Sequence, residues 1–344
     1  MINTLTAEQI LNAKYPGDIF SCDMDKLKAE YRSLVRIWHP DSHEDKDLAT
    51  SVMIKLNKLY ELGQQMLKDG TWKTSSYVEL ITLDGKLVRI RPQYEGYFEL
   101  GKFYVSRTHV IYLVDRMHRR FYDNYRQRVR DLRFADTRME SEFKRFLPNI
   151  VDRFETEEFL GVVVSKSEDM IPLRLVLNYF KGQIPDRHMA WILSSLYNLA
   201  CFLYFNKLAH NGITVDNYFI SPQDHNGVLL GGWWYTVPFG EKLIGAPKEV
   251  FDVMSMRVKT EKKATYETDL DSIRQIGRVL LGDPLGTSLL RHTTLPQPVA
   301  EWLVGGSKAD PFKEYELWGQ TLKKGWGKRE FVEMRVSLED VYKA

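Results

Sequence analysis

The sequence has little cysteine: Cys22 and Cys201 are the only two among 344 residues. They stand far apart, so neither a disulfide framework nor a four-ligand zinc site can be built from them. The chain also has little net charge, because 48 Lys and Arg residues are balanced by 46 Asp and Glu residues. A formal charge of +2 gives no field over the whole protein that would draw it to nucleic acid or anionic lipid. Any such partner must be recognised by a local patch.

Targeting and membrane segments are also missing. Residues 1–10 lack the basic segment and apolar core of a signal peptide. The long apolar run Met189–Asn206 could cross a bilayer, but it contains Ser194, Ser195 and Asn198. We therefore expect a buried core helix here, no membrane partner and a cytoplasmic protein.

What is present is the composition of a folded protein. Hydrophobic residues make up 44% of the chain and charged residues 27%, which is too apolar for a disordered chain. A length of 344 residues exceeds what one hydrophobic core usually organises. Two or three domains are expected.

The first seventy residues predict three helices. Thr6 and Gln9 form a capping box for a short helix through Lys14, and Asp23 can cap a second helix. A third helix is expected from Leu48 to Lys68, with Gly70 placed to end it. The apolar faces of the second and third helices are Leu27, Tyr31, Leu34, Val35, Val52, Leu56, Leu59, Gly63 and Met66.

A polar turn beginning His39-Pro40-Asp41 separates the second and third helices. Pro40 cannot continue a helix and biases His39 out of the helical region, so the tripeptide must project from a loop. The preceding helix carries a cation every four residues on its polar face: Lys28, Arg32 and Arg36. Alone, such a stripe is more typical of a solvated helix face.

With its flanking helices, the segment LKAEYRSLVRIWHPD (Leu27–Asp41) closely resembles the J-domain of DnaJ-like co-chaperones. The match covers residues of about 6–70. In that family the His-Pro-Asp loop and the basic second helix dock on a DnaK-type heat-shock ATPase and stimulate its ATP hydrolysis. The resemblance implies that His39, Pro40 and Asp41 bind such a chaperone, with Lys28, Arg32 and Arg36 steering the encounter. The Gly/Phe-rich segment and cysteine-rich zinc module of some DnaJ-like proteins are missing.

The next hundred residues predict a small antiparallel sheet with one helix. Tyr77–Ile90 alternates around the turn Asp84-Gly85, which indicates a hairpin. Further expected elements are strands at Phe103–Ser106 and Thr108–Val114, a helix at Glu140–Phe146 and a strand pair within Val151–Ser165.

An arginine-rich interval, Arg116–Arg133, interleaves arginines with Phe121, Tyr122 and Tyr125. Such a cluster could bind a phosphate backbone and stack bases. Aspartates also lie among the arginines, so a salt-bridged surface helix is the favoured interpretation. Nucleic acid stays an alternative partner, not the expected one.

The second half turns helical. Apolar spacing predicts helices at Leu173–Tyr179, Asp186–Leu208, Asp269–Leu281 and Phe312–Lys324. The long helix is followed by HNGITVDNYFISPQDHNGVLLGGWWY. This order resembles the protein-kinase-like fold: a buried helix, a catalytic-type loop, two short strands, a metal-loop position, then APKEV and another helix. The resemblance spans residues of about 77–340.

Residue by residue, the resemblance implies a degenerate kinase site. His210 matches the loop histidine and Asn217 the metal-binding asparagine, but Gly212 stands where the family has its catalytic aspartate. Asp216 stands four residues too late to replace it. Gly231 and Gly232 occupy the place of the magnesium aspartate, so no carboxylate is available there.

The other kinase parts are weak or structural. Candidates for the glycine-rich loop, the phosphate lysine and its glutamate partner are Gly96, Gly101, Lys102, Glu140 and Glu142. By resemblance, Asp271 ties the catalytic-type loop to the following helix, and Ala246–Glu249 matches the Ala-Pro-Glu segment. We expect Trp233, Trp234 and Tyr235 to pack as core, with a partner-binding aromatic patch as the alternative.

These observations predict an α+β protein: a J-domain of antiparallel helices, then a bilobal protein-kinase-like fold. The expected domains are residues 1–72, a small β-rich lobe at 73–180 and a large helical lobe at 181–344, with a short linker at Gly70–Lys73. Fusions of this kind resemble gene products of tailed bacteriophages, which would place the protein in the host cytoplasm.

The expected function is that of a J-domain co-chaperone that recruits a DnaK-type ATPase. The pseudokinase would act as a scaffold for an unknown protein client, with no catalytic residue, no metal and no cofactor. ATP binding in the degenerate cleft is possible but not expected. The alternatives are an atypical phosphotransferase or nucleotide-binding enzyme, and a nucleic-acid-binding protein that uses Arg116–Arg133.

Overall fold

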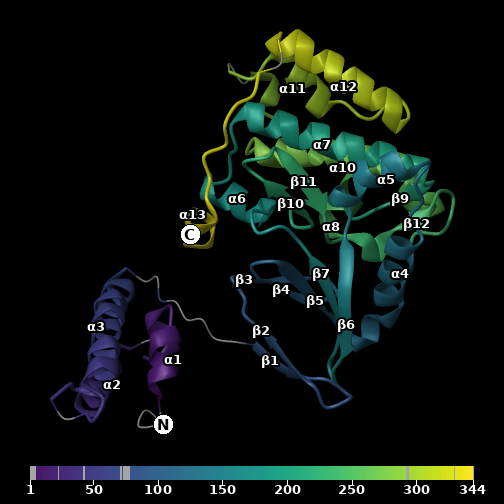
Figure 1. The fold of residues 1–344 in the computed structure, drawn as a ribbon. Coiled ribbons are helices and arrows are strands. Elements are labelled where there is room, and N and C mark those ends of the chain that lie inside the picture. The colour runs from purple at the N-terminus through teal and green to yellow at the C-terminus, as the bar shows by residue number, and fades with distance from the viewer. Residues whose placement is uncertain are drawn as a thin grey trace. The chain divides into compact units, whose positions relative to one another are not determined.

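The computed structural model describes residues 5–21, 23–41, 43–69, 72, 78–291, 294–328 and 330–343. The chain forms two compact units, Met1–Gln93 and Tyr94–Ala344 (Figure 1). Cys22, the predicted helix stop at Gly70 and most of the predicted linker Gly70–Lys73 lie outside the described residues. The predicted domain limits at 72 and 180 therefore stay predictions.

The three helices predicted for the first unit are confirmed. They are α1 (Ala7–Asn12), α2 (Met24–Trp38) and α3 (Lys46–Lys68), with a 3-10 turn η2 (Pro16–Asp18) after α1. The Thr6 and Gln9 side chains form the expected capping box, and the Asp23 carboxylate accepts the N–H groups of Asp25 and Lys26. Asp45 caps α3, so this helix begins two residues before the predicted Leu48.

The helices α2 and α3 pack side by side over a small core (Figure 1). Tyr31 stacks on Tyr60 at a centroid distance of 4.0 Å, and its hydroxyl donates to Asn57 Oδ1 at 2.7 Å. The buried residues of this core are Ile10, Ala13, Ile19, Phe20, Leu27, Leu34, Val52, Leu56 and Leu59. The predicted apolar faces are thus the ones that pack.

The predicted hairpin is present as β1 (Val78–Ile81) and β2 (Leu87–Ile90), paired antiparallel from Val78↔Ile90 to Ile81↔Leu87. Gly85 has a φ of +79° in the connecting turn, a value that favours glycine. By contact, this hairpin belongs to the first unit.

The second unit begins with a lobe built on a five-stranded antiparallel sheet of order β3-β4-β5-β7-β6. The strands are β3 (Tyr94–Phe98), β4 (Gly101–Val105), β5 (His109–Asp115), β6 (Asn149–Glu155) and β7 (Phe159–Ser165). Between β5 and β6 lie η3 (Arg116–His118), α4 (Arg119–Arg130), α5 (Thr137–Phe143) and η4 (Lys144–Phe146). The sequence analysis did not predict β3. It placed the helix Glu140–Phe146 about one turn late.

The rest of the unit is a helical lobe. Its helices are α6 (Leu173–Tyr179), α7 (Asp186–Phe205), α8 (Lys248–Val253), α9 (Met256–Glu261), α10 (Tyr266–Leu280), α11 (Gln297–Val304), α12 (Pro311–Trp326) and α13 (Leu338–Lys343). Short strands and turns are β8 (Ile171–Pro172), β9 (Leu208–Ala209), β10 (Tyr218–Ser221), β11 (Asn226–Leu229), η5 (Trp233–Tyr235), β12 (Val237–Pro238) and η6 (Leu289–Arg291). α7 contacts both α10 and α12 and is mostly buried, as expected of a core helix (Figure 1).

None of the described helices is both long and apolar enough to cross a bilayer. Within the described residues, no three His, Cys, Asp or Glu side chains are grouped so that they could hold a metal ion.

Candidate functional site: an exposed loop and a degenerate kinase-like centre

The tripeptide His39-Pro40-Asp41 lies in the loop that follows α2. His39 ends the helix in an extended conformation, with φ −70° and ψ 126°. Its ring Nδ1 accepts the backbone N–H of Asp41 at 3.3 Å and lies 3.6 Å from the Asp41 carboxylate. The side chain of Asp41 is 91% exposed and that of His39 is 48% exposed. The loop therefore presents a carboxylate and an imidazole to solvent.

The base of this loop is held by aromatic packing. His43 stacks on Trp38 at 4.9 Å, and its backbone N–H donates to the carbonyl of His39 at 3.1 Å. On α2, Lys28 is half-buried while Arg32 and Arg36 are exposed. Among the described residues, no carboxylate lies within ion-pair distance of these three cations. The basic face of α2 is thus followed directly by a loop that exposes a carboxylate.

The catalytic-type loop of the second unit is tied to α10 by a buried carboxylate. Asp269 Oδ2 accepts the N–H of His210 at 2.7 Å, and its Oδ1 accepts that of Asn211 at 2.9 Å. The sequence analysis assigned this role to Asp271, which was wrong: Asp271 accepts the N–H of Ser307 instead. Burial raises the pKa of Asp269 to about 7, although the two N–H groups oppose the shift.

His210 fills a dry site beneath this loop. The side chain is fully buried and packs edge-on against Trp233 at 4.8 Å. Within the described residues, neither ring nitrogen has a hydrogen-bond partner. Burial lowers the pKa of His210 to about 3, so the ring is neutral at physiological pH. The ring contributes packing against Trp233 and no charge.

The predicted degenerate positions do come together. Asn217 Nδ2 donates to the carbonyl of Gly212 at 2.9 Å, and the N–H of Gly231 donates to the carbonyl of Asn217 at 3.2 Å. A Cβ atom added at Gly212 would lie 2.6 Å from the carbonyl oxygen of Gly232, and one added at Gly231 would lie 2.3 Å from Asn217 Oδ1. A side chain at Gly212 would meet backbone atoms, which cannot rotate away, whereas one at Gly231 would meet the end of the Asn217 side chain. A carboxylate therefore has no room at Gly212 unless the backbone shifts.

Asp216, the remaining acid of the loop, is engaged elsewhere. Arg174 of α6 donates to both of its carboxylate oxygens, Nε to Oδ1 at 2.8 Å and Nη2 to Oδ2 at 2.7 Å. These hydrogen bonds to the Asp216 carboxylate raise the pKa of Arg174. Both carboxylate oxygens of Asp216 are therefore directed at α6 by a bidentate ion pair.

The pair that holds phosphates in a protein kinase comes from the third strand of the small lobe and the helix after it. Here these are β5 and α4, and β5 contains no lysine while α4 contains no glutamate. Their inward side chains are Tyr112 and Tyr125, which are both buried. Tyr125 stacks on Trp234 at 4.2 Å and donates to the carbonyl of Leu230 at 3.1 Å.

Aromatic rings thus pack between β5 and α4, the elements that carry the lysine and glutamate in a protein kinase. Trp234 also contacts Tyr112 at 5.3 Å and Phe98 at 5.6 Å. We call Phe98, Tyr112, Tyr125 and Trp234 the aromatic cluster. The sequence prediction that Trp233, Trp234 and Tyr235 pack as core is confirmed, because all three are buried.

The other candidates from the sequence lie elsewhere. Lys102 neighbours Phe103 on β4 and so faces the opposite side of the sheet, near Glu95 and the Phe159 ring. Glu140 and Glu142 lie on α5, paired with Lys144 and Arg138. As phosphate lysine and partner glutamate, these three assignments were wrong.

The turn expected to carry a glycine-rich cover is a tight hairpin. Because Phe98 pairs with Gly101, only Glu99 and Leu100 lie between the two strands. Glu99 accepts a hydrogen bond from the Tyr235 hydroxyl at 3.1 Å, and Leu100 is buried. The turn is tied down and too short to cover a triphosphate.

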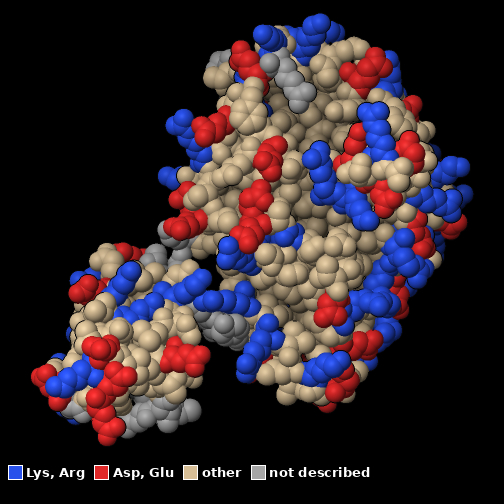
Figure 2. All heavy atoms as spheres, in the orientation of Figure 1, with Lys and Arg blue, Asp and Glu red and all other residues tan. Residues whose placement is uncertain are grey.

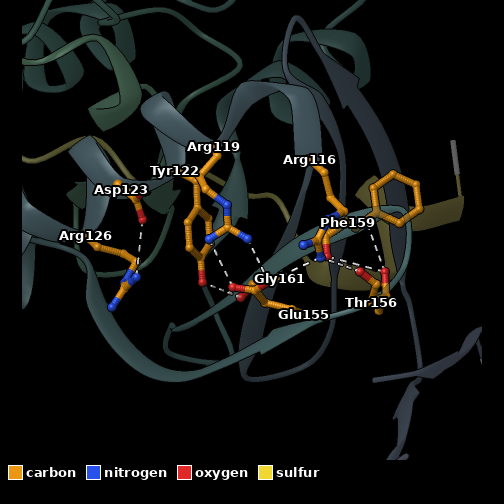
Figure 3. A network of polar contacts seen from close by, with 9 residues as sticks. All are labelled: Arg116, Arg119, Tyr122, Asp123, Arg126, Glu155, Thr156, Phe159 and Gly161. Carbon is orange, nitrogen blue, oxygen red and sulfur yellow. Dashed lines mark hydrogen bonds and ion pairs between the residues drawn. The ribbon is translucent and has the colours of Figure 1, made fainter. Parts of the chain in front are cut away.

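The arginines of η3 and α4 are largely occupied by carboxylates (Figure 3). Arg116 and Arg119 converge on Glu155, at 3.2 and 2.7 Å. The hydrogen bond from Arg119 is the largest cause that lowers the pKa of Glu155. Two further arginines pair with neighbouring aspartates, Arg126 with Asp123 and Arg130 with Asp131. This geometry is that of the salt-bridged surface helix that the sequence favoured.

Comparison with known proteins gives a fold likeness. No protein-family profile matches the sequence, and no curated protein matches it. Among solved structures, vaccinia related kinase 3 is 14% identical, with 74% of this chain and 92% of that chain covered and a TM-score of 0.49. The BubR1 kinase domain is 12% identical, with 71% and 87% covered and a TM-score of 0.45. At these identities and TM-scores, the likeness supports no statement about function. The kinase-like fold rests on the sheet lobe, the helical lobe and the tie between Asp269 and the loop.

The buried Asp269 predicts an unusual dependence of stability on pH. Its pKa is about 7 in the folded chain and about 3.9 in an unfolded one, so the folded state holds the proton more tightly. The contribution is fully present below pH ~4 and is lost as pH rises through about 7; at ~1.4 kcal/mol per unit it amounts to roughly 4 kcal/mol.

Urea unfolding at several pH values from 4 to 8 checks this prediction. His210 gives an opposite slope, because its lowered pKa makes stability fall as pH drops below about 6.5. The comparison is therefore between the wild type and Asp269→Asn, which cannot titrate. The unfolding free energy of the wild type minus that of Asp269→Asn should decrease by up to roughly 4 kcal/mol between pH 4 and 8. A difference that does not change with pH would contradict the buried, protonated carboxyl.

Proposed function

We propose that this chain is a J-domain co-chaperone whose kinase-like unit is not catalytic and serves as a scaffold. The observation that supports it is the exposed His39-Pro40-Asp41 loop at the end of the basic face of α2. A basic helix can steer onto an acidic chaperone surface, and a loop held at its base can insert a carboxylate there. The partner would be a DnaK-type ATPase.

The scaffold part rests on the closed centre of the second unit. A side chain at Gly212 would meet backbone atoms of Gly232, and the aromatic cluster packs between β5 and α4. A domain of this kind can hold a protein client without turning over ATP. Joining it to a chaperone-recruiting unit raises the local concentration of chaperone at the client, which needs no new contact.

The steady-state ATPase rate of a purified bacterial DnaK-type chaperone tests the proposal. Adding the full chain should raise this rate several-fold, and His39→Gln should return it to that of the chaperone alone. Reversing Arg32 and Arg36 to Glu should weaken stimulation most at low salt, where steering is strongest. Lys58→Glu, an exposed change on α3, is the matched control and should have little effect.

Two outcomes would contradict the proposal. If His39→Gln still stimulated the chaperone ATPase, the stimulation would not depend on the His39-Pro40-Asp41 loop. If the wild type gave no stimulation, the co-chaperone proposal would be wrong for that chaperone. ATP turnover by the protein alone would instead favour the atypical phosphotransferase, against which the glycine contacts and the Arg174–Asp216 pair already stand.

A further inference from the structure

Four exposed lysines gather where three segments of the helical lobe lie side by side. The carbonyl of Lys207 accepts a hydrogen bond from the 237–243 segment at 3.0 Å, and that of Lys262 accepts another from it at 2.8 Å. Lys242 pairs with Lys263 in an antiparallel bridge. We call Lys207, Lys242, Lys262 and Lys263 the lysine edge. Residues 55 positions apart in sequence thus contribute to one cationic surface.

The charge of the lysine edge is not balanced locally. Within the described residues, none of the four has a carboxylate within 4.0 Å, unlike the arginines of α4. The acids adjacent to these lysines in sequence are Glu241 and Glu261. Four lysines therefore stand beside two glutamates in these segments.

A fifth cation lies next to this surface. The backbone N–H of Arg133 donates to Asn206 Oδ1 at 2.7 Å, which brings this exposed arginine beside Lys207. Figure 2 shows Lys and Arg along this margin of the second unit, near β9, β12 and α4, with Asp and Glu interspersed among them. The lysine edge differs from the rest of the margin in that its four lysines have no carboxylate within 4.0 Å among the described residues.

Two of the lysines are held in a strained backbone. Lys207, just past α7, has a φ of +56°, and Lys262, which caps α9, has a φ of +54°. Glycine or asparagine usually takes these positions, because a Cβ in the left-handed region costs roughly 1–2 kcal/mol. A cation in the last helical turn would serve the helix dipole without this strain. Lys181, just past α6 and outside the lysine edge, has a φ of +55° as well. The strain therefore identifies Lys207 and Lys262 as positions where glycine is tolerated, and a use for their charge is inferred from the lack of paired carboxylates among the described residues.

The composition of the surface favours one class of partner. Lysine is depleted in protein–protein interfaces, whereas lysine and arginine supply the phosphate contacts that dominate nucleic-acid binding. We propose that the lysine edge binds the phosphate backbone of nucleic acid without reading bases. This surface is separate from the arginines of Figure 3, which carboxylates already occupy.

Binding of the full chain to fluorescein-labelled 20-nucleotide single-stranded DNA, duplex DNA and RNA, measured over a series of salt concentrations, tests this. The slope of log K against log salt should become shallower by about 0.7–0.9 for each lysine removed. The first variant is Lys207→Gly with Lys262→Gly, which removes two charges and relieves two strained φ values. It should weaken binding at least fivefold at low salt and leave the thermal midpoint unchanged or higher. The second adds Lys242→Gln and Lys263→Gln.

The matched control is Lys323→Gln with Lys324→Gln, two exposed lysines at the end of α12. It should bind like the wild type. A wild type that binds none of the three nucleic acids, or lysine-edge variants with unchanged affinity and slope, would overturn the proposal. Binding of labelled poly-glutamate but of no nucleic acid, lost in the same variants, would replace it with an acidic protein partner. The ATPase assay with DnaK is a separate readout, so the two proposals can fail independently.

Discussion

Replacing Gly212 with aspartate, the residue that a kinase carries there, is expected to lower the free energy of unfolding by about 3 kcal/mol or more. A Cβ at this position would lie 2.6 Å from the carbonyl oxygen of Gly232 and 2.9 Å from its Cα. Both are backbone atoms, which cannot rotate away as the end of a side chain can. Overpacking costs about 1–3 kcal/mol, and burying a carboxylate with no cation beside it adds to this.

The contact is mutual, which makes it hard to relieve. Gly232 has a φ of +79°, and a Cβ there would lie 2.4 Å from the carbonyl oxygen of Gly212. The two chain segments approach through backbone alone. A repaired kinase centre would need both segments to move apart, together with the aromatic cluster behind them. We therefore expect no magnesium-dependent ATP turnover from Gly212→Asp, even combined with Gly231→Asp.

Urea unfolding followed by tryptophan fluorescence measures this effect. Gly306→Asp is the matched control, because no atom lies within 4 Å of a Cβ at Gly306. A change of less than about 0.5 kcal/mol is expected there, as for most surface substitutions. If Gly212→Asp were as stable as the wild type and gained ATPase activity, the prediction would be wrong. A single substitution would then restore catalysis, and backbone packing would not prevent it.

The first unit could be predicted from the sequence because its signals are local. Thr6 with Gln9, and Asp23, mark helix starts within a single turn, and the apolar spacing on α2 and α3 identifies the packed faces. The start of α3 was missed because Asp45 caps it from inside a run of charged residues. Helix capping and periodicity need no knowledge of distant parts of the chain.

The aspartate that binds the catalytic-type loop was predicted two residues too late, at Asp271 instead of Asp269. The helical spacing of the sequence does distinguish the two. Asp269 shares its helix face with Ile273 and Ile276, at the i+4 and i+7 positions, and all three are buried. Asp271 lies on a different face. A resemblance gives only an approximate position, whereas the 3.6-residue period of the helix distinguishes two aspartates two residues apart.

The aromatic cluster could not be predicted, because its members come from distant segments. Tyr112 and Tyr125 lie more than a hundred residues before Trp234, and nothing in their local sequence marks them as neighbours. The sequence analysis did not recognise β3 and took Lys102 from the stretch EGYFELGK, beside its candidate glycines. Once β3 is included, the third strand is β5, which has no lysine.

Truncating Glu314 to alanine is expected to destabilise the second unit by about 3–5 kcal/mol. Arg274 of α10 and Glu314 of α12 form an ion pair at 2.5 Å, with side chains only 3% and 1% exposed. The same carboxylate accepts the N–H groups of Lys308 and Ala309. Its removal leaves a guanidinium and two N–H groups buried without it, and removing one partner of a buried pair costs this much.

The Glu314 carboxylate pairs with Arg274 and also accepts two backbone N–H groups. A second substitution at Glu314 distinguishes the loss of the charge from the loss of these hydrogen bonds. Glu314→Gln keeps an oxygen for the backbone N–H groups and loses the charge, so its cost should fall between those of wild type and alanine. Glu316→Ala removes a carboxylate from the exposed pair with Lys313 and should cost under about 1 kcal/mol. Arg274 also donates to the carbonyl of Trp302 and lies over its ring at 4.4 Å, so it cannot leave the core easily. Equal unfolding free energies for Glu314→Ala and Glu316→Ala would contradict the buried pair. A loss of stability that small is expected only if the Glu314 side chain is hydrated in the folded protein.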